Sequence, residues 1–121
     1  MAGTNKILVI DDESALLKII GRFLSKMEFQ ADLAESGSEG ITKFKGDPVG
    51  YKGVVIDYSL PEMPCKDIIG QIRALNSDIK IILSTGFSAK ELKNEKDLAV
   101  DDTLQKPFTF DDFKEVIKRN F

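Results

Sequence analysis

Three runs of almost unbroken apolar residues predict the most deeply buried strands of the chain. They are Ile7–Ile10, Val54–Ile56 and Ile79–Leu83. Apolar side chains on successive positions cover both faces of a strand, which is typical of the centre of a parallel sheet. Weaker runs at Phe29–Ala34 and Asp102–Leu104 predict two further strands.

Apolar residues at helical spacing separate these runs. The groups are Leu16, Ile20, Phe23 and Met27, with Ile19 and Leu24 beside them; Ile41 and Phe44; Ile68, Ile69, Ile72 and Leu75; and Phe113, Val116 and Ile117. Capping-box patterns open helices at Ser36–Glu39 and Ser88–Glu91, and Thr109–Asp112 caps the final helix, with Phe108 placed to pack on Phe113. The helix after Ser88 is mostly polar, so we expect it to be weakly anchored.

Strand and helix alternate five times with short connections. This order predicts an α/β fold, a doubly wound five-stranded parallel sheet with helices on both faces. The length of 121 residues suits one domain spanning 1–121, and 42% apolar with 31% charged residues is a globular balance.

Charge and cysteine usage narrow the class of protein. The net charge is −3 and the basic residues are scattered, which argues against direct binding of nucleic acid. The opening residues lead into an apolar run of only four residues, Ile7–Ile10, which is too short for a signal peptide or a membrane span. The single cysteine, Cys65, cannot form an internal disulfide, so we expect a cytoplasmic protein.

The chain contains no histidine, which excludes several kinds of site. A Ser-His-Asp or Cys-His catalytic site cannot be built, nor a zinc site that uses histidine, nor a phosphohistidine. Any bound metal must be held by oxygen, which indicates a hard cation such as Mg²⁺.

Polar residues follow four of the predicted strands: Asp11 and Asp12, Asp57, Thr85, and Lys106. The carboxyl ends of parallel strands share one edge of the sheet, where open α/β sheets bind ligands. Three carboxylates brought together repel one another unless a cation or a proton intervenes. A lysine and a hydroxyl beside them can contact a phosphate, so the set resembles a phosphoryl-transfer site with a carboxylate nucleophile.

Each of these residues also has an ordinary structural interpretation. An aspartate between a strand and a helix commonly caps the helix, and a threonine before Gly86 commonly satisfies a turn. Lone solvent-exposed acids and lysines are frequent in loops. The four groups falling together at matching strand ends favour a functional site.

The motifs resemble those of response-regulator receiver domains. Asp-Asp-Glu follows the first strand, the segment Asp57–Met63 follows the third, Ser-Thr-Gly the fourth and Lys-Pro-Phe the fifth. The resemblance covers nearly the whole chain and implies a flavodoxin-like sheet with strand order 2-1-3-4-5. It also implies a domain that catalyses only its own phosphorylation and dephosphorylation.

The resemblance implies a role for each site residue. Asp57 would accept a phosphoryl group from the phosphohistidine of a sensor histidine kinase or phosphotransfer protein, and would then switch contact with a downstream protein. Asp12, Asp57 and the carbonyl of Ser59 would ligate Mg²⁺, and Asp11 would hold it through water. Lys106 would contact the phosphoryl group, and Thr85 would move toward it. The Lys106–Pro107 bond would be cis.

Two positions depart from the family pattern. Pro64-Cys65 stands where the family usually has Asp-Gly, at the turn into the third helix. Thr103 stands where the family usually has an aromatic ring that turns inward on activation. Thr103 lacks the volume for that packing change. We therefore expect phosphorylation to shift the face of the molecule around Thr103 less than in the family, or to act through the loop around Phe87 instead.

Three other functions would use some of the same residues. A Mg²⁺-dependent phosphatase or hydrolase with Asp57 as nucleophile would need a general acid, and Ser59 stands where a second acid is expected. A nucleotide-binding fold would carry a glycine-rich loop after the first strand. A receiver that binds partners without phosphorylation does not require the acidic set that is present here.

Overall fold

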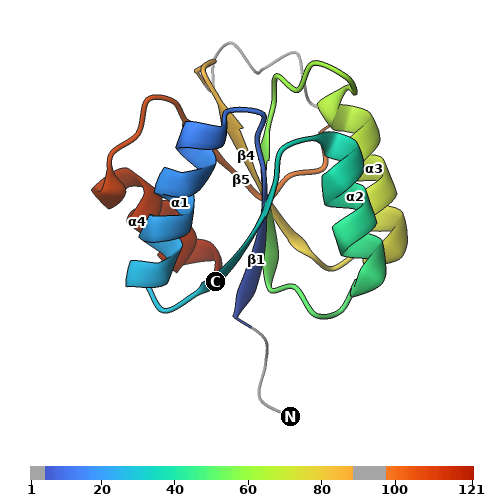
Figure 1. The fold of residues 1–121 in the computed structure, drawn as a ribbon, viewed down its shortest axis with the longest axis horizontal. Helices are drawn as coiled ribbons and strands as arrows, with labels where there is room; N and C mark the ends of the chain where they lie inside the picture. The colour runs from blue at the N-terminus through green and yellow to red at the C-terminus, as the bar shows by residue number, and fades with distance from the viewer. Residues whose placement is uncertain (1–4, 89–97) are drawn as a thin grey trace.

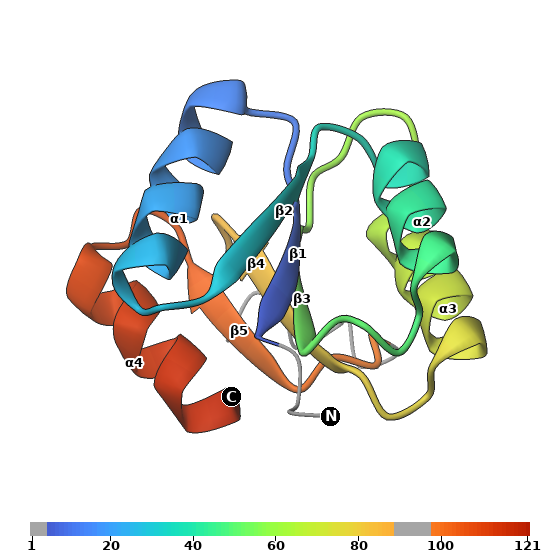
Figure 2. The same ribbon diagram turned by 60° about the horizontal axis from the view of Figure 1, so that its bottom comes forward.

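The computed structural model describes residues 5–88 and 98–121 as a single parallel sheet flanked by helices (Figure 1). The elements are β1 Lys6–Ile10, α1 Ser14–Lys26, β2 Gln30–Ala34, α2 Gly37–Gly46, β3 Gly53–Asp57, α3 Cys65–Leu75, β4 Lys80–Thr85, β5 Asp102–Gln105 and α4 Phe110–Asn120. The strand order is β2-β1-β3-β4-β5, and every pair is parallel, which confirms the predicted fold class (Figures 1 and 2).

The sheet separates two hydrophobic layers. Helices α1 and α4 cover one face, and α2 and α3 cover the other (Figure 1). Val55 of β3 packs in the α1/α4 layer, whereas its neighbours Val54 and Ile56 pack in the α2/α3 layer. Successive side chains of a strand point to opposite faces, so a strand covered on both sides needs an unbroken apolar run. This explains why the pattern predicted β1, β3 and β4 correctly.

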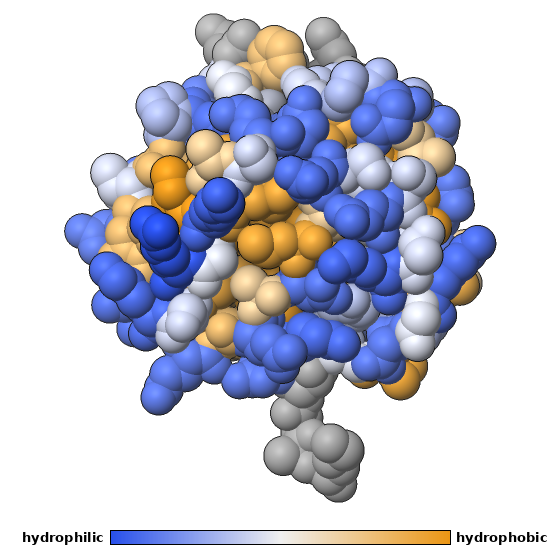
Figure 3. Space-filling model, in the orientation of Figure 1, coloured by the Kyte–Doolittle hydropathy of each residue, from blue (hydrophilic) through white to orange (hydrophobic). Residues whose placement is uncertain are grey.

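The burial of two predicted apolar faces differs from the expectation. In α1 the fully buried residues are Leu17, Ile20 and Leu24, whereas Ile19 is 43% exposed. At the end of α3, Leu75 is 38% exposed. Four of the five residues from 16 to 20 are apolar, so spacing alone does not fix which of them faces inward. Apolar side chains reach the surface between the two helix layers in Figure 3.

Contacts with the neighbouring helix α4 set the rotation of helix α1 about its own axis. The ring of Phe23 lies 5.0 Å from that of Phe110 and 5.6 Å from that of Phe113, measured between ring centroids. These contacts turn Leu17, Ile20 and Leu24 toward the sheet. They join residues almost ninety positions apart, so the pattern within α1 could not predict them.

Two of the predicted helix caps, at Ser36 and Thr109, form, the first of them in altered geometry. Thr109 and Asp112 make a complete reciprocal capping box at the start of α4. Ser36 accepts a hydrogen bond from the backbone of Glu39, but the Glu39 carboxylate accepts from the N–H of Glu35, one residue before the expected partner. The Ser36 pattern therefore marked the correct helix start with only half of the box.

Two further predictions concern the ends of helices. Phe108 packs on Phe113 with ring centroids 5.9 Å apart, as expected. Pro64 precedes the first residue of α3, so the helix begins normally despite the departure from Asp-Gly.

The helix predicted from Ser88–Glu91 lies almost wholly outside the described residues. Across the described residues, no helix is both long enough and apolar enough to cross a membrane.

Candidate functional site

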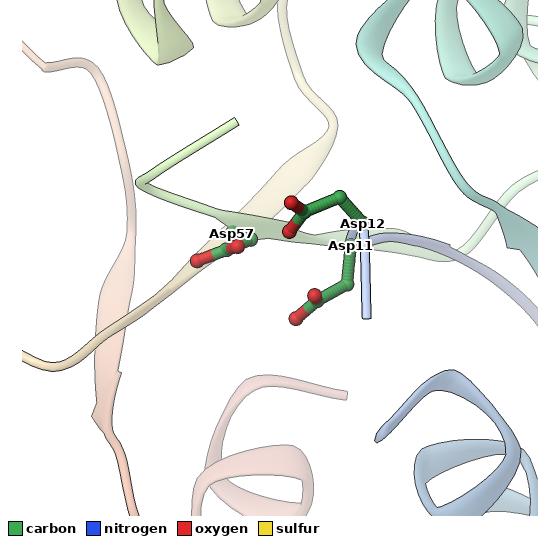
Figure 4. A group of neighbouring side chains, drawn as sticks. All are labelled: Asp11, Asp12 and Asp57. Atoms are coloured by element: carbon green, nitrogen blue, oxygen red, sulfur yellow. The ribbon is translucent and has the colours of Figure 1, made fainter. Parts of the chain in front are cut away.

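Three carboxylates meet at the carboxyl edge of the sheet (Figure 4). Asp11 and Asp12 directly follow β1, and Asp57 is the last residue of the adjacent strand β3. One oxygen from each carboxylate lies within 4.8 Å of the others. Asp11 is 1% exposed and Asp57 is 5% exposed, whereas Asp12 faces solvent. An all-oxygen set of this size, with one side open to water, fits a hydrated Mg²⁺ ion.

Lys106 brings a positive charge into this cluster. Its Nζ lies 3.1 Å from Oδ2 of Asp11, 3.3 Å from Oδ1 of Asp57 and 3.7 Å from the carboxylate of Glu13. Lys106 comes just after β5, so its side chain reaches past the end of β4 to the acids on β3 and β1. The structure thus brings together Asp11, Asp12, Asp57 and Lys106, as the strand-end argument predicted.

The charges in the cluster do not balance. Burial, followed by the neighbouring charge of Asp11, raises the pKa of Asp57, and Lys106 and the Ser59 N–H offset only part of the increase. Burial opposes the charge of Lys106, but its contacts with Asp11 and then Asp57 outweigh this and raise its pKa. One ammonium serves several carboxylates, so the site has room for a second cation.

Asp11 also has an ordinary role in the chain turn. Its Oδ1 accepts a hydrogen bond of 2.9 Å from the N–H of Glu13, just before α1 begins. Its Oδ2 faces Lys106. The ordinary structural role of Asp11 therefore uses its Oδ1, and its predicted role in the site uses its Oδ2. Sequence reasoning missed the contact between Glu13 and Lys106, although the third acid of Asp-Asp-Glu was visible.

Thr85 and Ser59 lie at the same edge through local contacts. The Thr85 side chain is buried, and its hydroxyl accepts a hydrogen bond of 3.0 Å from the N–H of Phe87. The Thr85 carbonyl accepts from the N–H of Lys106 at 2.6 Å. Ser59 donates its N–H to Oδ1 of Asp57 at 3.3 Å. The expected metal contact of Ser59 involves its carbonyl, which stays a prediction.

Thr103 lies on β5 beside an open groove. The groove has a volume of about 500 Å³ and is also lined by Lys106, Val116 and Arg119. The Lys106–Pro107 peptide bond at its end is cis, as the resemblance implied. On the far side of β4, the ring of Phe87 meets that of Tyr58 edge-on, with centroids 5.6 Å apart.

Comparison with known proteins agrees with this geometry. The family model described as the response regulator receiver domain matches residues 7–118. The acid tolerance regulatory protein ActR of Rhizobium meliloti is 35% identical over 107 residues, which cover 88% of this chain and 54% of that protein. The transcriptional regulatory protein CusR of Escherichia coli is 31% identical over 107 residues, covering 87% and 46%. The chain spans about half the length of these relatives.

Solved structures show the same fold. The response regulator protein TrrA of Thermotoga maritima, in complex with Mg²⁺ and BeF, is 32% identical, with a TM-score of 0.85 and coverage of 96% of this chain and 98% of that one. A receiver domain protein from Clostridium thermocellum is 28% identical, with a TM-score of 0.84 and coverage of 95% and 92%. The matched span includes all the strand-end motifs, and the chain belongs to the response regulator receiver domains of two-component systems.

Proposed function

We propose that this chain is a phosphoacceptor switch in which Asp57 takes a phosphoryl group from the phosphohistidine of a partner kinase or phosphotransfer protein. A carboxylate oxygen of Asp57 forms the new O–P bond as the N–P bond of the phosphohistidine breaks. The electron pair of the broken bond stays on the imidazole nitrogen, and the imidazole leaves neutral because its other ring nitrogen already carries a proton. The observation that carries the proposal is the nearly buried Asp57 held between a second acid and a shared lysine.

The residues around Asp57 support this role. Lys106 neutralises developing negative charge on the transferred group because its ammonium already lies within 3.3 Å of the nucleophile. The Ser59 N–H orients the carboxylate through Oδ1. The Thr85 hydroxyl uses only its oxygen in accepting from Phe87, so its proton can be donated to the phosphoryl group.

Asp12, Asp57 and the Ser59 carbonyl would hold Mg²⁺ directly, and Asp11 would hold it through water. The ion supplies positive charge that lets an anionic donor approach an acidic edge. A neighbour solved with Mg²⁺ and BeF supports the assignment.

The output of the switch is a protein contact. The domain acts on no separate metabolite; it catalyses its own phosphorylation and its own dephosphorylation, in the cytoplasm. Its basic residues are scattered and its net charge is −3, so we assign it no direct contact with nucleic acid or membrane. The matched region covers 46% of the transcriptional regulatory protein CusR, so more than half of that protein lies outside the region shared with this chain.

The direct test is an intact mass measurement after incubation with acetyl phosphate, with Mg²⁺ or with EDTA. We expect a phosphoryl adduct that requires Mg²⁺, maps to Asp57 and is absent in Asp57→Asn. Asp47→Asn is a matched control because that exposed aspartate lies outside the cluster. An adduct on Ser59 or Thr85, or one indifferent to EDTA, would contradict the proposal.

The path of the signal can be followed by NMR with and without beryllofluoride and Mg²⁺. The groove beside Thr103 contains no ring from that position, so we expect the largest remote shifts in the loop at Phe87. Large shifts centred on Thr103 and α4, with Phe87 unmoved, would show that the signal takes another path.

A further inference from the structure

Glu62 joins two parts of the molecule that are distant in the sequence. Its carboxylate accepts a hydrogen bond of 2.7 Å from the backbone N–H of Gly37, 25 residues earlier. Gly37 is the first residue of α2, and Glu62 lies in the loop between β3 and α3. The first N–H groups of a helix have no partner within the helix and lie at its positive end, so a carboxylate there is favoured in both hydrogen bonding and charge.

The loop that contains Glu62 also contains Ser59, whose carbonyl is the predicted backbone ligand of Mg²⁺. The start of this loop is attached to the sheet, because the N–H of Tyr58 donates to the carbonyl of Ser84 at 2.9 Å and Leu60 is buried. Glu62 provides a second point of attachment, three residues after Ser59. This second attachment is made to α2 rather than to the sheet.

The start of α2 is held firmly enough to act as an anchor. Gly37 is buried, and a Cβ atom at this position would lie 2.5 Å from Cδ1 of Ile68 on α3. The helix begin is also capped by Ser36, whose hydroxyl accepts from the N–H of Glu39. Helices α2 and α3 lie side by side on one face of the sheet (Figure 2). The Gly37 N–H is therefore a fixed donor for the loop.

We propose that Glu62 is a positioning residue, which holds the loop of Ser59 in place for Mg²⁺ through its hydrogen bond to Gly37. This inference rests on the proposed function, in which the Ser59 carbonyl is a metal ligand. A backbone carbonyl cannot be aimed by rotating a side chain, so its place depends on the order of the loop. A loop that is ordered beforehand loses less conformational entropy when the ion binds.

The same contact couples the metal site to α2. Coupling between two events is reciprocal, so an ion that orders the loop also stabilises the hydrogen bond between Glu62 and Gly37. If Glu62 served only to cap α2, its removal would lower stability equally with and without Mg²⁺. Its effect on the affinity for Mg²⁺ therefore distinguishes positioning from capping.

Glu39 offers a matched control at the same end of α2. Its carboxylate accepts a hydrogen bond of 2.6 Å from the N–H of Glu35, a contact within the turn between β2 and α2. Replacing either Glu62 or Glu39 with alanine removes one negative charge and one hydrogen bond from a backbone N–H. In this pair of contacts, the one made by Glu62 reaches the loop of Ser59.

The test measures Mg²⁺ binding by calorimetry and stability by thermal unfolding, on the full chain. Glu62→Ala should bind Mg²⁺ roughly fivefold more weakly than the wild type, the lower end of the coupling between linked sites. Glu62→Gln keeps an acceptor oxygen and should bind nearly as the wild type does. Glu39→Ala should lose stability as Glu62→Ala does but keep the wild-type affinity.

A second measurement follows the Gly37 amide by NMR while Mg²⁺ alone is added. The amide signal should shift in the wild type and in Glu62→Gln, because the ion changes the hydrogen bond that this N–H donates. In Glu62→Ala the shift should be lost. A shift that stays the same in Glu62→Ala would contradict the coupling between the loop and α2.

The outcomes separate this inference from the proposed function. If the wild type does not bind Mg²⁺, or Asp57→Asn binds it equally well, the proposed metal site fails. If Asp57→Asn loses Mg²⁺ but Glu62→Ala binds it like the wild type, the role of Glu62 alone is wrong. Equal weakening in Glu62→Gln would assign the effect to charge, and equal weakening in Glu39→Ala would assign it to the stability of α2; either result overturns the inference.

Discussion

Two aspartates of the sheet, Asp32 on β2 and Asp57 on β3, each lie beside a lysine, and their pKa values shift in opposite directions. The Lys43 ammonium is 3.0 Å from Asp32, and the Tyr51 hydroxyl donates to the other oxygen of Asp32. Burial opposes the charge of Asp32, but these two hydrogen bonds outweigh it and lower its pKa. Burial and then Asp32 raise the pKa of Tyr51.

The difference lies in how many acids each lysine serves. Lys43 forms an ion pair with Asp32, whereas Lys106 is shared among Asp11, Asp57 and Glu13. Asp32 belongs to a closed network in which each charge is matched. Asp57 belongs to an open network with an excess of negative charge, which favours the binding of a further cation. A lysine at hydrogen-bond distance therefore does not by itself identify a structural ion pair.

The largest expected effect comes from removing the shared lysine. Lys106→Ala should lower the free energy of unfolding by about 3 kcal/mol in EDTA, because it leaves two buried carboxylates unneutralised. Mg²⁺ should restore most of this loss and bind more tightly than in the wild type, since a competing cation is gone. Urea unfolding with and without Mg²⁺ measures both. A folded variant that has lost Mg²⁺ affinity would contradict the role given to Lys106.

The two aspartates should respond with opposite signs to the same substitution. In EDTA at pH 7, Asp32→Asn should lower the free energy of unfolding by about 2 kcal/mol, because two hydrogen bonds to a charge are weakened. Asp57→Asn should raise it by roughly 1 kcal/mol, the scale of one charge repulsion near a protein surface. If urea denaturation shows that both substitutions change the free energy of unfolding in the same direction, the two aspartates have similar charge environments.

Acid should remove both differences. The folded pKa of Asp32 lies below its ordinary value of 3.8, so its stabilisation is complete above that value and is lost as the pH falls through the folded pKa. The folded pKa of Asp57 is raised, so its destabilisation develops as the pH rises through that pKa. Both asparagine variants should approach the wild type in pH-dependent urea unfolding once the pH falls below the folded pKa of Asp32. A difference in the free energy of unfolding between variant and wild type that does not change with pH would mean that packing, not charge, causes the effects.

The smallest change in the free energy of unfolding should come from removing Lys43, which pairs with one acid. The Lys43 side chain is 35% exposed, and Tyr51 still donates to Asp32 when Lys43 is absent. Lys43→Ala should therefore cost no more than about 1 kcal/mol, as for a partly exposed pair. The measurement is urea unfolding beside Lys106→Ala, and a loss as large as that of Lys106→Ala would mean that sharing among acids does not set the cost.

Much of the site could be predicted from the sequence, because the alternation of strands and helices places the carboxyl ends of all strands at one edge of the sheet. Unbroken apolar runs identified β1, β3 and β4, and the parallel arrangement then brought Asp11, Asp57 and Lys106 to one edge. The rotation of α1, with Ile19 outward, depends on aromatic contacts with α4 from the other end of the chain. Local periodicity contains no information on such contacts.

The hydrogen-bond network around Asp32 and the unpaired hydroxyl of Ser84 could not be predicted from the sequence either. Tyr51 and Lys43 meet Asp32 only after α2 and the loop before β3 are folded against β2. Ser84 looked like part of a Ser-Thr-Gly turn. Its lack of a partner becomes visible only when every neighbouring donor and acceptor has been placed.

The alternation of side chains along β4 has a mechanical consequence. Ser84 faces the α1/α4 layer beside Asp57, and the next residue, Thr85, points to the layer of α2 and α3 that holds Leu83. One peptide unit joins them, so a twist of the strand about its own axis swings the two hydroxyls in opposite senses. A rotation at the end of β4 therefore displaces side chains in both helix layers at once.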